Sequence, residues 1–396
     1  METKTYKLKD IAISVFDGVH NTVLDNENGD CFLLSAKNIK NGIISFDQTD
    51  RKIDKSTRDK LSKRTNLAKD DVLVTTVGTV GELAIVDENY QKYEFQRSVG
   101  IIKCNQEIVL PQYLYYLLKT ESYNYYLHVV ATGAAQLCIF LSTLKNIKIK
   151  LPNLHVQSDV VSVLSKYDKL INNYKKQIKD LQNLASELYK EWFVRFRFPG
   201  YEKASFENGI PVGWKYITLK ELANVEMGQS PESCFYNRDK VGLPFHQGVG
   251  NYGALYLKDE VYSSEGTRIA KSGSIIFSVR APVGKINITL NKIILGRGVA
   301  GINSKEGKNG FLLWSLKSKF SKEDLIGNGS IFASVTKVEL LKQKILIPSR
   351  DILNEYDEFA SDIEKRSRTL YLQVLNLSKQ RDLLLPRLMS GKLEEK

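Results

Sequence analysis

Residues 131–152 read ATGAAQLCIFLSTLKNIKIKLP, and residues 327–348 read GNGSIFASVTKVELLKQKILIP. The two stretches align without a gap at a constant offset of 196 residues, close to half of the 396-residue chain. Earlier segments repeat with small slips: 6–12 against 216–223, 72–77 against 274–279, 96–99 against 296–299, and 113–119 against 311–317. A chain of two diverged copies has pseudo-twofold symmetry, which suits a target or partner that is itself two-sided.

The composition allows two globular units and favours an acidic partner. A chain of 396 residues with 42% hydrophobic residues can form two or three cores, and two equal units fit the repeat best. The net charge of +12 and the pI near 9.2 come from charges spread over both halves. This balance favours a polyanion, although charge alone leaves other partners open.

The cysteines and the apolar runs indicate a cytoplasmic protein. Cys31, Cys104, Cys138 and Cys234 are far apart and have no histidine at metal-ligand spacing, as expected for a reducing compartment. The start METKTYKLKD lacks the apolar core of a signal peptide, and no apolar run approaches the roughly 18 residues that a membrane span needs. We therefore expect no membrane partner and no bound metal.

Each copy is predicted to be a mixed domain followed by a long helix. Short apolar runs between Gly, Asn and Asp indicate strands in the first hundred residues, followed by a helix over 113–127 and a closing strand over 144–152. The second half repeats this order. The expected segments are a first domain at 1–152, a helix at 153–198, a second domain at 199–348 and a helix at 349–396.

Both long helices carry a heptad pattern. The first has apolar or aromatic residues at positions 171, 174, 178, 181, 185, 188 and 192, and the second at 363, 370, 374, 377, 384 and 388, with Ser367 and Arg381 as imperfect positions. A single amphipathic helix usually packs on its own domain. Two matching patterns instead favour an α+β fold in which a pair of antiparallel coiled-coil helices separates the two domains.

Catalytic motifs are missing from this sequence. The nearest approach to a phosphate loop, residues 301–309, has one residue too many between its glycines and ends in Asn where Ser or Thr would hold magnesium. No Asn-Pro-Pro-Tyr loop for methyl transfer is present, and the four histidines are scattered. A single-chain nuclease or methyltransferase is therefore disfavoured, whereas a binding subunit and a two-domain adaptor that binds no DNA both remain open.

Three segments stand out along the chain: LYKEWFVRFRFPG at residues 188–200, GIPVGW at 209–214 and LLPRLMSGKL at 384–393. Together they resemble the specificity (S) subunit of type I restriction-modification systems. The resemblance covers nearly the whole chain and includes the order domain, helix, domain, helix. It implies two target recognition domains, each reading one half of a bipartite site in double-stranded DNA. The helices would space the domains and dock two methyltransferase (M) subunits.

The same resemblance implies that this chain is not an enzyme and has no cofactor of its own. S-adenosylmethionine, ATP and magnesium would be bound by partner chains, including restriction (R) subunits in a full complex. No catalytic residue is therefore assigned.

Polar and basic residues on loops are the candidates for contacting DNA, because their side chains match base edges and phosphates. In the first domain they are Asp17, His20, Asn21, Ser35, Lys37, Asn38, Arg97, Thr132, Gly133 and Gln136. In the second they are Gln229, Ser230, His246, Gln247, Asn251, Tyr252, Arg280, Arg297, Asn328 and Gly329.

Each candidate also has a purely structural interpretation. Asp17 and Asn21 could simply form a turn, Lys37 could belong to a surface ion pair, and Arg97, at the repeat position of Arg297, could be a buried structural residue. The glycines let a backbone approach DNA closely, but they also make ordinary turns.

Overall fold

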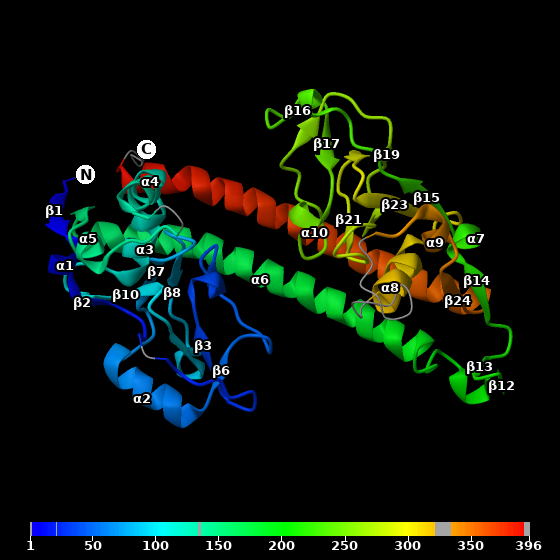
Figure 1. Cartoon of the computed structure of the whole chain (residues 1–396), viewed down its shortest axis with the longest axis horizontal. Helices are drawn as coiled ribbons and strands as arrows, with labels where there is room; N and C mark the ends of the chain where they lie inside the picture. The colour runs from blue at the N-terminus through cyan, green and yellow to red at the C-terminus, as the bar shows by residue number, and fades with distance from the viewer. Residues whose placement is uncertain (1, 21, 134–135, 321–333, 392–396) are drawn as a thin grey trace. The chain divides into compact units, whose positions relative to one another are not determined.

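The computed structural model describes residues 2–20, 22–133, 136–320 and 334–391, and its contacts divide the chain into two compact units (Figure 1). Unit 1 comprises residues 1–171 and 375–396, and unit 2 comprises residues 172–374. These units differ from the predicted segments, because each contains part of both long helices. None of the described helices is both long and apolar enough to cross a membrane.

Unit 1 contains one four-stranded sheet and three shorter sheets among its described residues. Its strands are β1 (Lys4–Lys7), β2 (Ala12–Asp17), β3 (Cys31–Leu34), β4 (Ile39–Lys40), β5 (Ile43–Ile44), β6 (Lys52–Ile53), β7 (Val72–Thr75), β8 (Leu83–Ile85), β9 (Tyr93–Phe95), β10 (Val99–Cys104) and β11 (Lys148–Leu151). Its short helices are α1 (Leu8–Ile11), α2 (Lys55–Thr65), α3 (Pro111–Lys119), α4 (Glu121–Val130) and α5 (Leu141–Lys145). The four-stranded sheet has the order β2-β10-β7-β8, β6-β3-β9 forms a second sheet, and β11 closes the unit by pairing with β1.

Unit 2 repeats this plan. Its strands are β12 (Phe206–Glu207), β13 (Ile210–Pro211), β14 (Lys215–Thr218), β15 (Ala223–Met227), β16 (Tyr236–Asn237), β17 (Leu243–His246), β18 (Tyr262–Ser263), β19 (Ile269–Ala270), β20 (Ile275–Ser278), β21 (Ile286–Ile288), β22 (Ile293–Leu295), β23 (Val299–Ser304) and β24 (Lys344–Ile347). Its short helices are α7 (Leu219–Leu222), α8 (Asn309–Lys319) and α9 (Lys337–Leu341). The four-stranded sheet is β15-β23-β20-β21, and β24 pairs with β14.

The central strands are apolar on both faces, because each four-stranded sheet is covered on both sides. In β7, Val72 and Val74 belong to a core that also contains residues of α3, whereas Leu73 faces a second core with Tyr93 and Phe95 of β9. A strand buried in this way shows a continuous apolar run instead of alternation.

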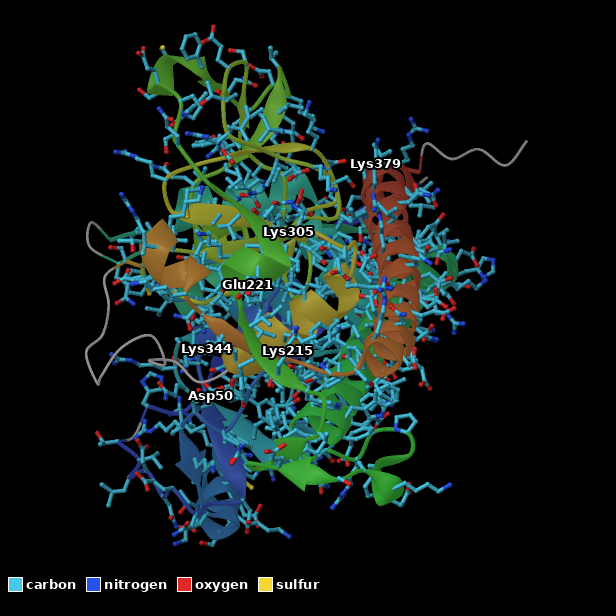
Figure 2. The ribbon with its side chains drawn as sticks, turned by 90° about the vertical axis from the view of Figure 1, so that its right-hand side faces the viewer. Asp50, Lys215, Glu221, Lys305, Lys344 and Lys379 are labelled. Carbon is cyan, nitrogen blue, oxygen red and sulfur yellow. The ribbon has the colours of Figure 1, made fainter. Side chains whose placement is uncertain are left out.

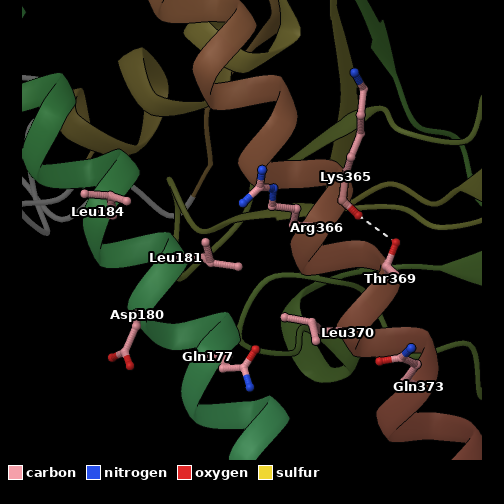
Figure 3. Close-up of a pocket in the computed structure, with 9 residues that line it drawn as sticks. All are labelled: Gln177, Asp180, Leu181, Leu184, Lys365, Arg366, Thr369, Leu370 and Gln373. Atoms are coloured by element: carbon pink, nitrogen blue, oxygen red, sulfur yellow. Dashed lines mark hydrogen bonds between the residues drawn. The ribbon is translucent and has the colours of Figure 1, made fainter.

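The long helices are α6 (Leu154–Phe193) and α10 (Arg350–Met389), and they run antiparallel to each other within unit 2 (Figure 3). There the Tyr356 hydroxyl donates to Ala185 O at 2.9 Å. In unit 1, Leu164 of α6 and Leu385 of α10 share a core. Apolar seams of this kind are what the heptad pattern predicts.

Two sequence-based expectations need correction. The helix predicted over 113–127 is split into α3 and α4 at Thr120, whose extended backbone (ψ 149°) breaks the helix. The alignment of residue 72 with 274 is also one residue out of register. Thr75 pairs with Val99 and Ser278 with Val299, so Val72 corresponds to Ile275.

Candidate nucleic-acid interface

Several of the candidate loops of unit 1 meet at one end of its four-stranded sheet. Because neighbouring strands in this sheet are antiparallel, β2 and β7 end where β10 and β8 begin. That end therefore carries the residues after Asp17, the residues before Val99 and the turn after Thr75. We call it the loop edge of unit 1, and the equivalent end of the sheet in unit 2 is the loop edge of unit 2.

Backbone hydrogen bonds of 2.7–3.0 Å hold the loop edge of unit 1 together. They run from Gly18 N to Val99 O, Val19 N to Phe95 O, Gln96 N to Leu34 O, Thr76 N to Ser98 O and Ile139 N to Thr76 O. Segments that lie far apart in the sequence are thereby fixed against one another. The approach at Gly18 is so close that an added methyl group would lie 2.2 Å from Phe95 O, which explains the glycine.

The loop edge of unit 2 is built from the equivalent bonds, with lengths of 2.8–3.0 Å. They run from Gly228 N to Val299 O, Gln229 N to Leu295 O, Gly296 N to His246 O, Val279 N to Gly298 O and Val335 N to Val279 O. A methyl group added at Gly228 would likewise lie 2.1 Å from Gly296 O. The repeat seen in the sequence is therefore a repeat of one backbone frame.

Arg97 and Arg297 occupy the same position in the two frames. Both residues are exposed, and neither side chain makes a hydrogen bond or ion pair with another residue among those that the structure describes. The interpretation of Arg97 as a buried structural residue is therefore wrong. An exposed guanidinium is the usual group for gripping guanine or phosphate.

Asp17 orients two neighbouring side chains, His20 and Arg64, at the loop edge of unit 1. Its carboxylate lies 2.6 Å from His20 Nε2 and accepts a hydrogen bond from Arg64 Nη2 at 3.2 Å. Asp17 is largely buried, whereas both partners are about half exposed. Sequence reasoning missed Arg64, although the basic run over 55–64 in α2 was a signal for it.

The loop edge of unit 2 presents a different set of side chains on the same frame. Gln229, Gln247 and Arg280 are exposed there, and Ser230 Oγ accepts a hydrogen bond from Arg297 N at 3.1 Å. The backbones of Arg280 and Ser334 form an isolated antiparallel β-bridge, just as those of Val77 and Cys138 do in unit 1. The structure therefore brings these four predicted residues and Arg297 together.

The segment before α5 also reaches the loop edge of unit 1. Thr132 and Cys138 form a bridge, and Gly78 N donates to Leu137 O at 3.1 Å. Thr132, Gly133 and Gln136 are exposed beside this contact, and Gly133 has a φ of +120°. Three other candidates, Asn21, Asn328 and Gly329, lie outside the described residues.

Asn38 and His246 are buried, so they cannot read a base edge. Asn38 is 4% exposed, and its amide donates to Ser45 O and to Asp50, both at 3.0 Å. His246 is 1% exposed, and its Nε2 lies 2.8 Å from Asp259 Oδ1. We remove both from the set of candidates, because their side chains are buried in the protein interior.

Ser35 and Lys37 belong to a turn in which Ser35 is half-buried and the Lys37 side chain is exposed. Ser35 N donates to the Asn38 side chain at 3.0 Å, and Lys37 forms a 2.8 Å ion pair with Asp50. Burial opposes ionisation of Asp50, but the hydrogen bonds from Lys37 and Asn38 outweigh it and lower the pKa of this carboxyl group. Ser98 Oγ accepts a bond from Ala36 N at 3.0 Å, which ties the turn to the loop edge.

Asn251 and Tyr252 are not placed at the loop edge by any contact among the described residues. The Tyr252 hydroxyl donates to Ile276 O at 3.4 Å, and burial raises its pKa. Asn251 Nδ2 donates to Glu260 at 2.8 Å. Tyr252 therefore serves the core of unit 2, and its role in DNA contact is withdrawn.

Positive charge is not confined to the loop edges. In unit 2, Lys215, Lys305 and Lys344 lie on one face near α7, away from the loop edge (Figure 2). Hydrogen bonds from Thr218, helped by the nearby Lys215 and Lys305, lower the pKa of Glu221 in the same region. Charge alone therefore does not locate a DNA surface, whereas the duplicated frame with its exposed arginines marks a candidate for one.

Within the described ranges, no group of three or more His, Cys, Asp or Glu side chains could hold a metal ion. The loop edges instead combine guanidinium, amide and hydroxyl groups with backbone held at fixed positions. Such groups form hydrogen bonds to base edges and phosphates.

Comparison with known proteins agrees with this geometry. A model of the type I restriction modification DNA specificity domain matches residues 1–183 and 211–369. The chain is 31% identical over 288 residues to a putative type I restriction enzyme MjaX specificity subunit of Methanocaldococcus jannaschii, covering 70% of this chain and 68% of the relative. It is 27% identical over 345 residues to the MjaIX specificity subunit of the same organism, covering 82% and 78%.

A solved structure shows the same fold. The S subunit of a type I restriction-modification system from M. genitalium superposes with a TM-score of 0.61 at 16% identity, covering 98% of this chain and 96% of that one. The predicted α+β class with a duplicated mixed domain and two long helices is confirmed. The resemblance noted in the sequence is confirmed as well, and the chain belongs to the family of type I restriction-modification DNA specificity domains.

Proposed function

We propose that this chain is the subunit that selects the DNA sequence in a type I restriction-modification complex. Each unit reads one half of a bipartite site in duplex DNA with the side chains of its loop edge. The long helices set the distance between the half-sites and dock two methyltransferase subunits. Restriction subunits join the same complex.

The duplicated frame is the observation that carries this proposal. Equivalent backbone bonds close both loop edges, and the same exposed arginine stands on each. The variable positions differ, since His20 corresponds to Ser230 and Ser35 to Gln247. A constant frame with different side chains suits two modules that read different base sequences in the same manner.

The chemistry of the complex is assigned to partner chains. This chain lacks the motifs for methyl transfer and cleavage, so S-adenosylmethionine, ATP and magnesium would bind to the methyltransferase and restriction subunits. The contribution of this chain is to place one adenine-containing half-site before each methyltransferase. The proposal thus describes a non-catalytic subunit that determines specificity.

A domain exchange tests the proposal. Replacing residues 6–150 by the matching segment of a related specificity subunit should change one half of the methylated motif and leave the other half and the gap intact. The matched control exchanges residues 216–347, which should change only the opposite half. Motifs are determined by sequencing methylated DNA from cells that carry the complex. A change in both halves from either exchange would rule out independent reading.

A further inference from the structure

A cavity of about 430 Å³ opens beside the loop edge of unit 1. Its lining includes the turn between β7 and β8, Lys119 at the end of α3, and Asn124 and His128 of α4. None of these side chains was singled out by the sequence, and the function proposed above assigns them no role. They therefore form a polar cluster whose role is still to be explained.

The turn between β7 and β8 contains two glycines that leave its backbone bare. Gly78 and Gly81 have φ angles of +84° and +87°. A methyl group built at Gly81 would lie 3.6 Å from both Asn124 Nδ2 and His128 Nε2, and one built at Gly78 would lie 3.6 Å from Gln136 Nε2. The side-chain nitrogens of Asn124, His128 and Gln136 therefore lie close to Gly78 and Gly81, where the turn has no side chains.

The cavity lining includes one cationic donor, Lys119, beside amide and imidazole groups that can also donate hydrogen bonds. Lys119 Nζ lies 5.5 Å from the centre of the Tyr115 ring, which holds the ammonium group at the cavity wall. Glu82 is an acidic member of the lining, but its carboxylate already accepts a hydrogen bond from Asn41 N at 2.8 Å. An ammonium group, an imidazole and amide groups together favour an anion with several acceptor oxygens.

The cavity and the loop edge share the turn after Thr75, whose residues 78–82 line the cavity. Thr76 N donates to Ser98 O at 2.9 Å, which places the start of the glycine turn against the residue that follows Arg97. DNA that meets Arg97 therefore passes close to the cavity. Contacts to phosphates fix the register of a protein on a duplex, whereas contacts to base edges specify the sequence.

We propose that this cavity binds a backbone phosphate of the DNA that lies on the loop edge of unit 1. Lys119, Asn124 and His128 donate to its oxygens, and the bare turn between Gly78 and Gly81 allows the sugar-phosphate chain to approach. This inference rests on the proposed function and adds a contact that positions the DNA without reading its sequence.

The described part of unit 2 does not repeat this arrangement. Its turn has the same frame, since Ser278 Oγ accepts from Lys285 N at 2.8 Å just as Thr75 Oγ accepts from Glu82 N at 2.9 Å. However, a methyl group built at Gly284 would lie 3.3 Å from the side chain of Phe320. An aromatic ring therefore faces this glycine, where unit 1 has an amide and an imidazole.

The test is DNA binding by the full chain assembled with methyltransferase subunits, measured against salt concentration. Lys119→Gln and, separately, Asn124→Leu should each weaken binding about tenfold for every duplex. Lys119→Gln should also make the slope of log affinity against log salt shallower by about 0.9. Lys148→Gln removes an exposed lysine of β11, away from the loop edge, and should leave the affinity and the slope as in the wild type.

Thermal unfolding of each variant first establishes that it is folded. A folded Lys119→Gln variant with wild-type affinity and slope would overturn the phosphate site while leaving the proposed function intact. A changed methylation motif in either variant would also overturn it, because a phosphate contact carries no sequence information. Failure of the wild-type complex to bind any duplex selectively would instead reject the proposed function and this site with it.

Inorganic phosphate serves as a second probe. One outcome is that inorganic phosphate raises the unfolding temperature of the isolated wild-type chain but not that of Lys119→Gln. If the salt slope of DNA binding is nevertheless the same for both proteins, the cavity binds a free anion and the DNA contact is overturned. Loss of both effects in Lys119→Gln would support the DNA phosphate site.

Discussion

Arg381 Nη1 lies 2.6 Å from Asp168 Oδ1, and this ion pair joins α10 to α6 within unit 1. The other oxygen of Asp168 accepts a hydrogen bond from the Tyr116 hydroxyl at 2.6 Å, so α3 takes part as well. Arg381 stands at a heptad position where an apolar residue is expected. Arg381 also pairs with Asp382 of its own helix at 2.8 Å, but its pairing with Asp168 requires this alignment of the two helices, which is how a polar seam residue fixes register.

Breaking this pair from one side should destabilise unit 1. Arg381→Met leaves the carboxylate of Asp168 without its cation, and we expect a loss of about 1–3 kcal/mol because both side chains are mostly buried. The double variant Asp168→Leu/Arg381→Met should recover much of this loss. Denaturant unfolding followed by circular dichroism measures both. Lys365→Gln, which breaks the exposed Lys365–Asp362 pair, is the control and should cost under about 0.5 kcal/mol.

Arg97 and Arg297 should act on separate half-sites. Arg97→Gln is expected to weaken binding by about 1–3 kcal/mol through contacts to the half-site that unit 1 reads, and Arg297→Gln should do the same for the other half. Duplexes that carry base changes in one half at a time, measured by competition binding, separate the two effects. If both variants lost discrimination at the same half-site, the assignment of one half to each unit would be wrong.

The isolated chain should neither methylate nor cut DNA. The absence of methyl-transfer and nuclease motifs motivates this expectation. Purified chain is incubated with target DNA and S-adenosylmethionine, or with magnesium and ATP, and methylation should start only when methyltransferase subunits are added. Reproducible turnover from the isolated chain, lost when a residue of this chain is substituted, would show a catalytic site here.

Lengthening α6 should widen the gap between the half-sites. Four residues inserted between Lys179 and Leu184 add about 6 Å at ~1.5 Å per residue, which corresponds to roughly two base pairs. Four residues are slightly more than one turn, so the seam nearly returns to register. We expect unchanged half-sites with a gap longer by about one or two base pairs, read by methylation sequencing. A fully active variant with the original gap would mean that α6 does not set the spacing.

Lys317 should make the stability of unit 2 depend on pH. Burial lowers its pKa to about 8, and its Nζ lies 5.0 Å from the centre of the Trp314 ring. Between pH 8 and about 10.5 the unfolded chain still holds the proton that the folded chain has released, so the wild type gains stability as the pH rises. Lys317→Met should therefore be more stable than the wild type by about 1–3 kcal/mol at pH 7.

That advantage of Lys317→Met should shrink as the pH approaches about 10.5, because the buried amine is then neutral in the folded wild type. Urea unfolding at a series of pH values measures the difference. The exposed Lys344→Met variant is the control and should differ from the wild type by a constant amount. A constant difference for Lys317→Met as well would contradict the burial of a charged amine.

The sequence by itself determined the architecture of the repeat. The gapless alignment ending at Pro152 and Pro348 predicts two copies, because similar sequences fold alike. The heptad spacing predicts α6 and α10, because burial of one helix face imposes a local periodicity. The family could also be recognised, since its motifs lie in continuous segments. Arg97 and Arg297 were identified as candidates because they are basic residues on predicted loops.

Only the tertiary structure decided which candidates can face DNA. Asn38 and His246 look like loop residues in the sequence, yet both point into the interior, while Asp17 holds Arg64 from a distant helix. The meeting of the glycine turn with α4 likewise had no sequence signal. Such outcomes depend on bonds between segments far apart in the chain, such as Thr76 N to Ser98 O, and local patterns of hydrophobicity carry no information about those pairings.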